Sequence, residues 1–329
     1  MLDPSPVPDA ALLACARDQF DRPATAITFL PLGYDANAWA YRLTAGDDIF
    51  LKVRRGAAAL PGLLAPRHVR DQGIEGVLAP LPARDGRLWA QLGEFSVTLQ
   101  PFVAGRDAWD SGLSDDQWVA FGELLRHVHA LLVPPELAAH LVAETFTPDH
   151  LDYLPRLAAR AQGPTPHDPV AAELVAVWRA HEATIAALLA RTAALGERLR
   201  HTDRPRVLCH ADAYLGNVLV GDDGRLWLID WDSAALAPRE RDLMFVIGGI
   251  AAGQVSPRQT ELFMRGYGPV NADPVALTYY RCAWAVQDIA AFGHTALLDD
   301  MAGEATRREA LRLFTATLAP GELAELALQ

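Results

Sequence analysis

The chain has 329 residues, of which 51% are hydrophobic and 21% are charged, a length and composition that predict a globular protein with two lobes or domains. Its 29 Lys and Arg against 41 Asp and Glu give a formal net charge of −12, which disfavours nucleic acid as a partner and suits a cationic small molecule. Three widely spaced cysteines argue against a disulfide framework or a zinc site. Neither a signal peptide nor a run of roughly 18 apolar residues is recognisable, so we expect a cytoplasmic protein that does not contact a membrane.

The first third of the chain is predicted to form a short helix and then a small antiparallel sheet. Apolar residues recur at helical spacing over residues 8–20, and short alternating segments separated by turns follow. The expected strands are residues 26–30, 38–43, 48–53, 77–81, 88–92 and 95–100. From Ser114, which suits a helix N-cap, the pattern becomes helical. The expected helices are residues 115–131, 150–163 and 168–200, and residues 256–329 are expected to be helical as well.

One lysine stands inside an apolar strand segment. Lys52 follows Ile49-Phe50-Leu51 and precedes Val53, and an ammonium group in such surroundings needs an anionic partner. The alternative is a lysine on the wet face of an edge strand. The strand by itself leaves both interpretations open.

The strongest pattern in the chain lies in a loop and a hairpin further on. Asp212 follows an apolar strand, Asn217 lies five residues later, and Asp230 comes after a Gly-Asp-Asp-Gly turn. If Asp223-Gly224 forms a two-residue turn, Asn217 lies directly opposite Asp230, with Cβ atoms roughly 5 Å apart. An amide oxygen and a carboxylate at that separation can share a hard cation such as Mg²⁺. Together with a carboxylate that deprotonates a hydroxyl, this is the set that phosphoryl transfer requires.

Two neighbours of these residues have simpler interpretations. A lone His-x-Asp pair is more often structural than catalytic, so we expect His210 to order its loop through hydrogen bonds to the backbone. Asp232 is either a further contact to Mg²⁺ or substrate, or a solvated carboxylate near the end of a strand.

The order His-x-Asp-x-x-x-x-Asn followed by Ile-Asp-Trp-Asp resembles the aminoglycoside phosphotransferase family, whereas protein kinases would show Asp-Phe-Gly at the last position. This resemblance implies an α+β, bilobal protein-kinase-like fold. It divides the chain into an N-terminal nucleotide-binding lobe (1–100) with an antiparallel sheet, a hinge (101–105) and a larger, mainly helical C-terminal lobe (106–329) with the catalytic loop and acceptor site. Phrases in the N-terminal lobe are most similar to spectinomycin phosphotransferases, notably residues 51–56 and 99–102.

The resemblance also implies roles for individual residues. Asp212 would orient the acceptor hydroxyl and take its proton, while Asn217 and Asp230 would hold one or two Mg²⁺ ions. Lys52 would reach the α- and β-phosphates of ATP, and the turn at residues 33–37 would cover the phosphates.

Two further contacts and one support follow from the same resemblance. The carbonyl group of Pro101 and the N–H group of Val103 would bind the adenine ring. Asp242 lies in an element that begins the helix supporting the catalytic loop, where it could accept hydrogen bonds from the backbone of that loop.

One departure from the family is expected to matter. Kinase-like folds usually provide a helix glutamate that holds the strand lysine. Residues 56–72, where that helix should lie, contain no glutamate, and Glu75 follows beyond it. Either another group holds Lys52, or Lys52 meets its partner only when nucleotide binds, or the site is impaired.

The sequence therefore predicts an ATP-dependent O-phosphotransferase for a small-molecule hydroxyl acceptor, with an aminoglycoside or aminocyclitol such as spectinomycin as the expected acceptor and ATP and Mg²⁺ as cofactors. Three alternatives stay open. They are a kinase for choline, homoserine, methylthioribose or a macrolide, a nucleotide-binding pseudokinase, and a metal-dependent hydrolase built on His210, Asp212, Asp230 and Asp232. The sequence does not indicate an oligomeric state.

Overall fold

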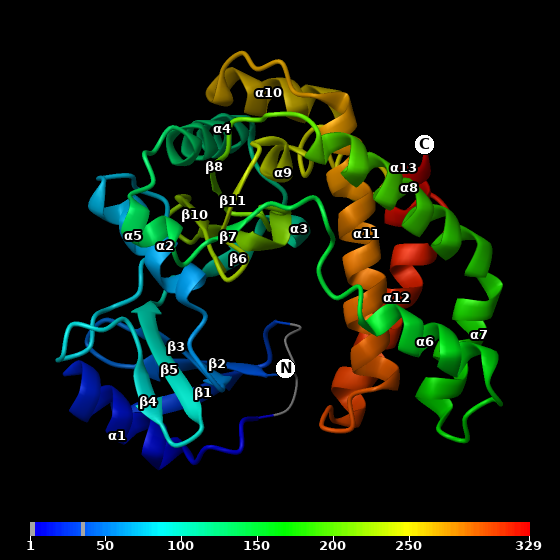
Figure 1. The fold of residues 1–329 in the computed structure, drawn as a ribbon. Helices are drawn as coiled ribbons and strands as arrows, with labels where there is room; N and C mark the ends of the chain where they lie inside the picture. The colour runs from blue at the N-terminus through cyan, green and yellow to red at the C-terminus, as the bar shows by residue number, and fades with distance from the viewer. Residues whose placement is uncertain (1–3, 34–36) are drawn as a thin grey trace. The chain divides into compact units, whose positions relative to one another are not determined.

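The chain, seen here as a computed structural model that describes residues 4–33 and 37–329, divides into two compact units (Figure 1). Unit 1 comprises Met1–Ala143, Arg206–Asp242 and Glu261–Pro269, and unit 2 comprises Glu144–Pro205, Leu243–Thr260 and Val270–Gln329. The lobe boundaries expected from the sequence stay a prediction.

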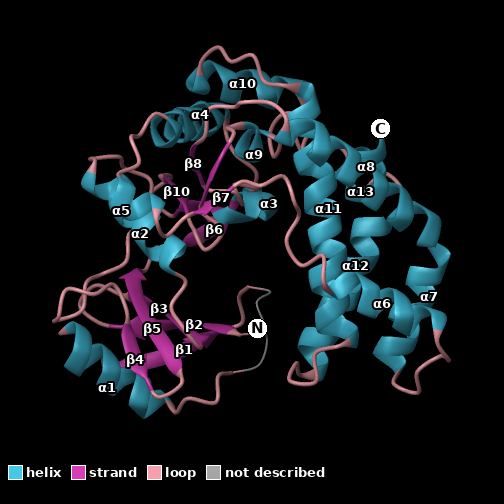
Figure 2. Ribbon diagram, in the orientation of Figure 1, coloured by secondary structure: helices cyan, strands magenta, loops and turns pink. Residues whose placement is uncertain are grey.

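Unit 1 contains a five-stranded antiparallel sheet (Figure 2). Its strands are, in spatial order, β1 (Ala26–Leu30), β2 (Ala38–Thr44), β3 (Ile49–Arg55), β5 (Phe95–Pro101) and β4 (Ala90–Leu92). Along β3 the buried residues Ile49, Leu51 and Val53 alternate with partly exposed ones, because successive side chains of a strand point to opposite faces. The buried face packs against helix α1 (Asp9–Phe20) in one hydrophobic core, and the other face carries Lys52 and Arg54.

The expected strand at residues 77–81 is wrong. Val77 makes only an isolated bridge to Leu228, and the segment runs as extended chain without a ladder. Val77 and Leu78 are buried all the same, and a short buried apolar run has the same sequence pattern as a strand. The helix expected before this segment is present as α2 (Leu60–Asp71).

Two small sheets and several helices complete unit 1. The sheets are β10 (Leu226–Leu228), β9 (Val218–Gly221) and β6 (Gly105–Asp107), and β7 (Val142–Ala143), β11 (Ala235–Ala237) and β8 (Val207–Cys209). The helices are α3 (Ala108–Ser111), α4 (Asp115–His129), α5 (Pro135–Ala138), the 3-10 turn η1 (Leu215–Asn217), α9 (Glu240–Leu243) and α10 (Pro257–Tyr267), the last two extending into unit 2. Ser114 caps α4 as expected, since its side chain accepts from the N–H group of Gln117.

The hairpin of β9 and β10 differs from the sequence prediction by one residue. Val218 pairs with Leu228, and the N–H group of Gly221 donates to the carbonyl of Arg225. The loop therefore has three residues and ends on a left-handed glycine, Gly224 (φ 79°), a common hairpin form. Asn217 lies opposite Ile229, whose N–H group donates to the Asn217 carbonyl at 3.0 Å, so the predicted direct pairing with Asp230 is wrong.

Unit 2 consists of helices and the loops that join them. The helices are α6 (Tyr153–Gln162), α7 (Pro169–Ala180), α8 (Glu182–Arg200), α11 (Pro274–Leu297), α12 (Glu304–Leu318) and α13 (Leu323–Leu328). The long helix α11 packs against each of the others. The single helix expected at residues 168–200 is in fact two, because the chain breaks at His181. Across the described residues, no helix is long and apolar enough to span a membrane.

Candidate active site

The loop that carries Asp212 lies between strand β8 and the turn η1, and its backbone is unusual. Ala211 has a left-handed conformation (φ 65°), which costs an alanine roughly 1–2 kcal/mol and must be imposed by its surroundings. The constraint comes from Asp242 at the start of α9. Its Oδ2 accepts from the N–H group of His210 at 2.9 Å, and its Oδ1 accepts from that of Ala211 at 2.6 Å. Asp242 thus holds the loop as the sequence suggested.

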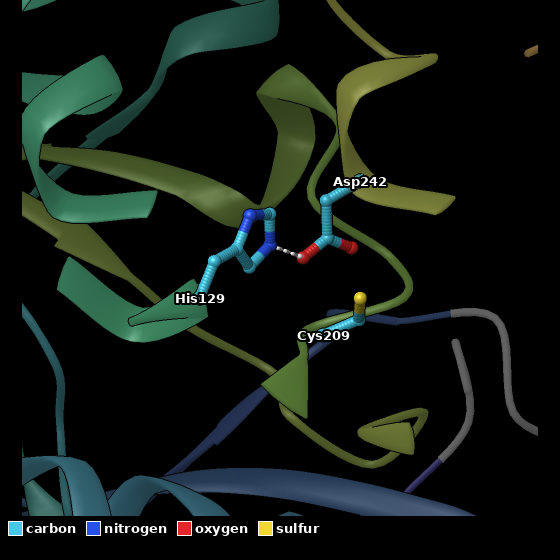
Figure 3. A group of neighbouring side chains, drawn as sticks. All are labelled: His129, Cys209 and Asp242. Atoms are coloured by element: carbon cyan, nitrogen blue, oxygen red, sulfur yellow. Dashed lines mark hydrogen bonds and ion pairs between the residues drawn. The ribbon is translucent and has the colours of Figure 1, made fainter. Parts of the chain in front are cut away.

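A buried network fixes Asp242 in turn (Figure 3). Nε2 of His129, on α4, donates to Asp242 at 2.9 Å, while Nδ1 of the same ring contacts the hydroxyl of Tyr267, on α10, at 2.7 Å. Burial alone would raise the pKa of Asp242, but the hydrogen bond and the charge of His129 hold it below its usual range. The carboxylate therefore stays charged and keeps its hydrogen-bond acceptors in place.

His129, Cys209 and Asp242 are residue types that bind metals, and their ligand atoms lie within 4.8 Å of one another. The Cys209 thiol points to the carbonyls of Ala237 and Pro238, and burial raises its pKa well above the usual value, which disfavours the thiolate that a metal would need. We therefore interpret this cluster as a support of the loop.

His210 orders the loop, in the way the sequence favoured. Its Nε2 lies 2.9 Å from the carbonyl oxygen of Ile229, which can only accept, while the N–H group of Asp212 donates to its Nδ1 at 3.3 Å. These two contacts fit one neutral tautomer. Burial lowers the pKa of His210, which favours the same neutral form. The ring also packs edge-on against Trp231.

Asn217 and Asp230 present the oxygen ligands of a candidate cation site. The amide nitrogen of Asn217 donates to the carbonyl of Asp212 at 2.8 Å, so the amide oxygen is the atom that could bind a cation. Asp230 has a left-handed backbone (φ 57°) and a half-exposed side chain. A neutral amide oxygen and a carboxylate oxygen are a donor set that suits Mg²⁺.

Lys52 lies close to this site. Its Nζ is 3.0 Å from Oδ1 of Asp230 and 2.8 Å from Oδ2 of Asp232. Burial alone would lower the pKa of Lys52, but the two carboxylates raise it above its usual range, so the ammonium is charged. Lys52 therefore has the anionic partners that its apolar strand requires.

The segment expected to bind adenine connects β5 to β6. Pro101 is exposed at the end of β5, and Val103 is half-buried and close to Gly221 of the β9–β10 hairpin. The N–H group of Asp222 donates to the carbonyl of Ala104 at 3.0 Å, which attaches the segment to that hairpin. The turn expected to cover the phosphates, residues 33–37, lies largely outside the described residues.

The sequence prediction missed Arg54 and left the role of Asp232 open. Arg54 contacts Oδ2 of Asp232 at 2.6 Å, and Asp232 itself pairs with Lys52. A signal for Arg54 was present, since Arg54 lies two residues after Lys52 in one strand and so shares its face. Its partner Asp232, in contrast, lies far away in the sequence.

The model of the family described as "Phosphotransferase enzyme family" matches residues 26–281. The protein StrN of Streptomyces griseus is 28% identical over 304 residues, covering 86% of each chain.

Among solved structures, spectinomycin phosphotransferase APH(9)-Ia in complex with ADP and spectinomycin superposes with a TM-score of 0.86 at 28% identity, covering 98% of each chain. Its AMP-bound complex gives a TM-score of 0.83 at 27% identity over the same share. The expected fold class, α+β and protein-kinase-like, is confirmed by this similarity.

Proposed function

The chain belongs to the phosphotransferase enzyme family, and from that premise we propose that it transfers the γ-phosphoryl group of ATP to a hydroxyl group of a small molecule. The proposed acceptor class is the aminoglycoside and aminocyclitol antibiotics, with spectinomycin first. One observation carries the proposal: unit 1 brings the charged Lys52 to within 3.0 Å of Asp230, next to the loop of Asp212 and Asn217. This proximity supports the proposal, because phosphoryl transfer requires a cation for the phosphates, a carboxylate for the acceptor hydroxyl and oxygen ligands for Mg²⁺.

In the proposed mechanism, Asp212 orients the acceptor hydroxyl and takes its proton as the oxygen attacks phosphorus. Asn217 and Asp230 would hold Mg²⁺, and the bound ion would supply positive charge to neutralise the phosphates. Lys52 contacts the nucleotide phosphates, and the backbone of Pro101 and Val103 contacts adenine. The acceleration would come mainly from positioning and from electrostatic stabilisation.

The choice of acceptor rests on similarity and on charge. The structure of highest similarity reported above contains ADP and spectinomycin, and the net charge of −12 suits a cationic acceptor. Choline, homoserine, methylthioribose and macrolides are the other acceptors to examine. The argument for the pseudokinase alternative is the missing helix glutamate. Lys52 has two other carboxylate partners, so the missing glutamate no longer favours that alternative.

The test is release of ADP with MgATP and each of four acceptors: spectinomycin, a kanamycin-type aminoglycoside, a macrolide and choline. We expect turnover on spectinomycin, reduced about 10²–10⁴-fold in Asp212→Asn because the general base is lost. The matched control is Asp222→Asn, which removes an exposed carboxylate from the hairpin loop and should leave turnover unchanged. Unaltered turnover in Asp212→Asn would contradict the mechanism, and ATP-independent hydrolysis of any acceptor would contradict the reaction type.

A further inference from the structure

The helix that would normally hold the strand lysine offers no carboxylate at the right place. Asp71 at the end of α2 pairs with Arg67 of the same helix. Glu75, the first glutamate after α2, accepts from Arg225 at 2.9 Å, and both side chains are largely exposed. Neither residue pairs with Lys52, so the partner of Lys52 lies elsewhere in unit 1.

Asp232 has the contacts expected of that partner. Its Oδ2 lies 2.8 Å from Nζ of Lys52 and 2.6 Å from a guanidinium nitrogen of Arg54. The two cations lie two residues apart on one face of β3, so a single carboxylate can bind both. The side chains of Lys52, Arg54 and Asp232 are 25–29% exposed, and in such partial burial charge-assisted hydrogen bonds are stronger than at a free surface.

Helix α2 fixes Asp232 from the other side by close backbone packing. A Cβ atom on Gly62 would lie only 2.9 Å from Cα and 3.1 Å from N of Asp232, and it would also collide with the carboxylate. Gly62 has ordinary helical geometry. The close contact therefore depends on the absence of a side chain at this position and not on a special backbone conformation. The helix thus contributes a surface against which Asp232 rests.

We propose that Asp232 is the positioning residue for Lys52, in place of the absent helix glutamate, and that it is held by Arg54 and by the backbone of α2 at Gly62. This inference rests on the proposed function. Asp230 is more exposed than Asp232 and, among the ion pairs described here, contacts only Lys52. Asp230 can therefore turn to a cation while Asp232 keeps Lys52 in place. The second acid of the Ile-Asp-Trp-Asp segment thus acts on the lysine and is not a metal ligand.

The experiment is a double-mutant cycle with Lys52→Met, Asp232→Asn and the double variant, measured in three ways. Turnover gives kcat and KM for ATP, and equilibrium binding of ADP gives a readout that needs no acceptor. Electron paramagnetic resonance with Mn²⁺ and ADP counts the bound ions. Asp48→Asn is the matched control, because it removes another carboxylate paired with an arginine of the same sheet, Arg42, away from Lys52. Thermal unfolding verifies that every variant is folded.

We expect Asp232→Asn to lower kcat at least ten-fold and to change KM for ATP by a smaller factor. In the double variant, kcat should equal that of Lys52→Met alone. The dissociation constant for ADP should change at least three-fold on Asp232→Asn when Lys52 is present, and less than 1.5-fold in the Lys52→Met background. The number of bound Mn²⁺ ions should stay the same.

Three results would overturn the inference: additive effects in the cycle, unchanged kcat in Asp232→Asn, or loss of a bound Mn²⁺ ion, which would make Asp232 a metal ligand. Failure of the proposed function looks different, since the wild-type protein would then turn over no acceptor while the cycle in ADP binding would still report the coupling. If Asp232→Asn fails to fold, Arg54→Met takes its place, with an expected decrease of kcat that vanishes in the Lys52→Met background.

Discussion

We expect the substitution Asp242→Ala to destabilise the protein by about 3–5 kcal/mol, because it removes the carboxylate that accepts hydrogen bonds from three buried donors beneath the loop of Asp212. Asp242 is fully buried and accepts hydrogen bonds from His129, His210 and Ala211. Its removal leaves three buried donors, each of which costs about 1–3 kcal/mol when unsatisfied. The loop can relax in part, so we expect a value in the lower part of that sum, about 3–5 kcal/mol.

Thermal unfolding followed by circular dichroism measures this effect. At about 2–4 °C per kcal/mol for a domain of this size, the midpoint should fall by about 10 °C. The unfolding midpoint of Asp242→Asn should lie between those of the wild-type protein and Asp242→Ala. The amide oxygen of the new side chain still accepts a hydrogen bond, but its amide nitrogen is a donor that faces a backbone N–H group. Glu75→Gln is the control: it removes an exposed carboxylate whose pair with Arg225 contributes at most about 1 kcal/mol.

The pH dependence gives a second, independent measurement. The pKa of Asp242 is lower in the folded protein than the value near 4 of an unfolded chain. Its contribution to stability is therefore complete above pH 4 and is lost as the pH falls through the folded-state pKa. The difference between the wild-type protein and Asp242→Ala should shrink below pH 4. A midpoint for Asp242→Ala within 2 °C of wild type at pH 7 would refute the idea that this carboxylate supports the loop.

Three further outcomes are expected. Gly62→Ala should lower the free energy of unfolding by about 1–3 kcal/mol through overpacking, and should lower turnover at least ten-fold. Gly46→Ala is the control, because its new Cβ meets no atom within 4 Å, and it should change neither stability nor turnover in unfolding and activity assays. Because burial lowers the pKa of His210, wild-type stability should fall as the pH drops below about 6.5, by up to about 1.4 kcal/mol per unit, and His210→Gln should flatten this slope in denaturation curves at pH 5–7. Asn217→Ala should raise the half-saturating Mg²⁺ concentration about ten-fold in a titration of turnover; an unchanged requirement would remove Asn217 from the proposed cation site.

Much of the fold could be read from the sequence where periodicity and burial agree. Strand β3 is an example: the strand expected at residues 48–53 is observed at Ile49–Arg55, and the buried residues Leu51 and Val53 alternate with partly exposed ones along it. The hairpin register could not be read in the same way. A two-residue turn at Asp223-Gly224 and the observed three-residue loop use the same residues, and both place a glycine where φ is positive. Pairing of β9 with β6, a strand more than one hundred residues earlier, adds a constraint that no local pattern contains.

The candidate site likewise has a part that the sequence predicts and a part that it does not. The spacing from Asp212 to Asn217 and Asp230 predicts the acids and the amide of the proposed site, because these residues are close in sequence. No local pattern predicts the partners of Lys52, since Asp230 and Asp232 follow it by 178 and 180 residues. A carboxylate that far away is indistinguishable by local pattern from any solvated aspartate, so only the three-dimensional contact with Arg54 and Gly62 sets Asp232 apart.

Two residues with a left-handed backbone lie at the proposed active site, and one histidine contacts both segments. Ala211 precedes Asp212, and the other such residue is Asp230; a conformation of this kind costs roughly 1–2 kcal/mol for a residue that is not glycine. His210 donates through its backbone to Asp242, accepts from the N–H group of Asp212, and donates through its ring to the carbonyl of Ile229, the residue just before Asp230. The strain at both places is therefore held by one buried network. Strain that is over-determined in this way is typical of sites where reacting groups need fixed positions. It follows that a substitution at His210 should disturb both carboxylates together.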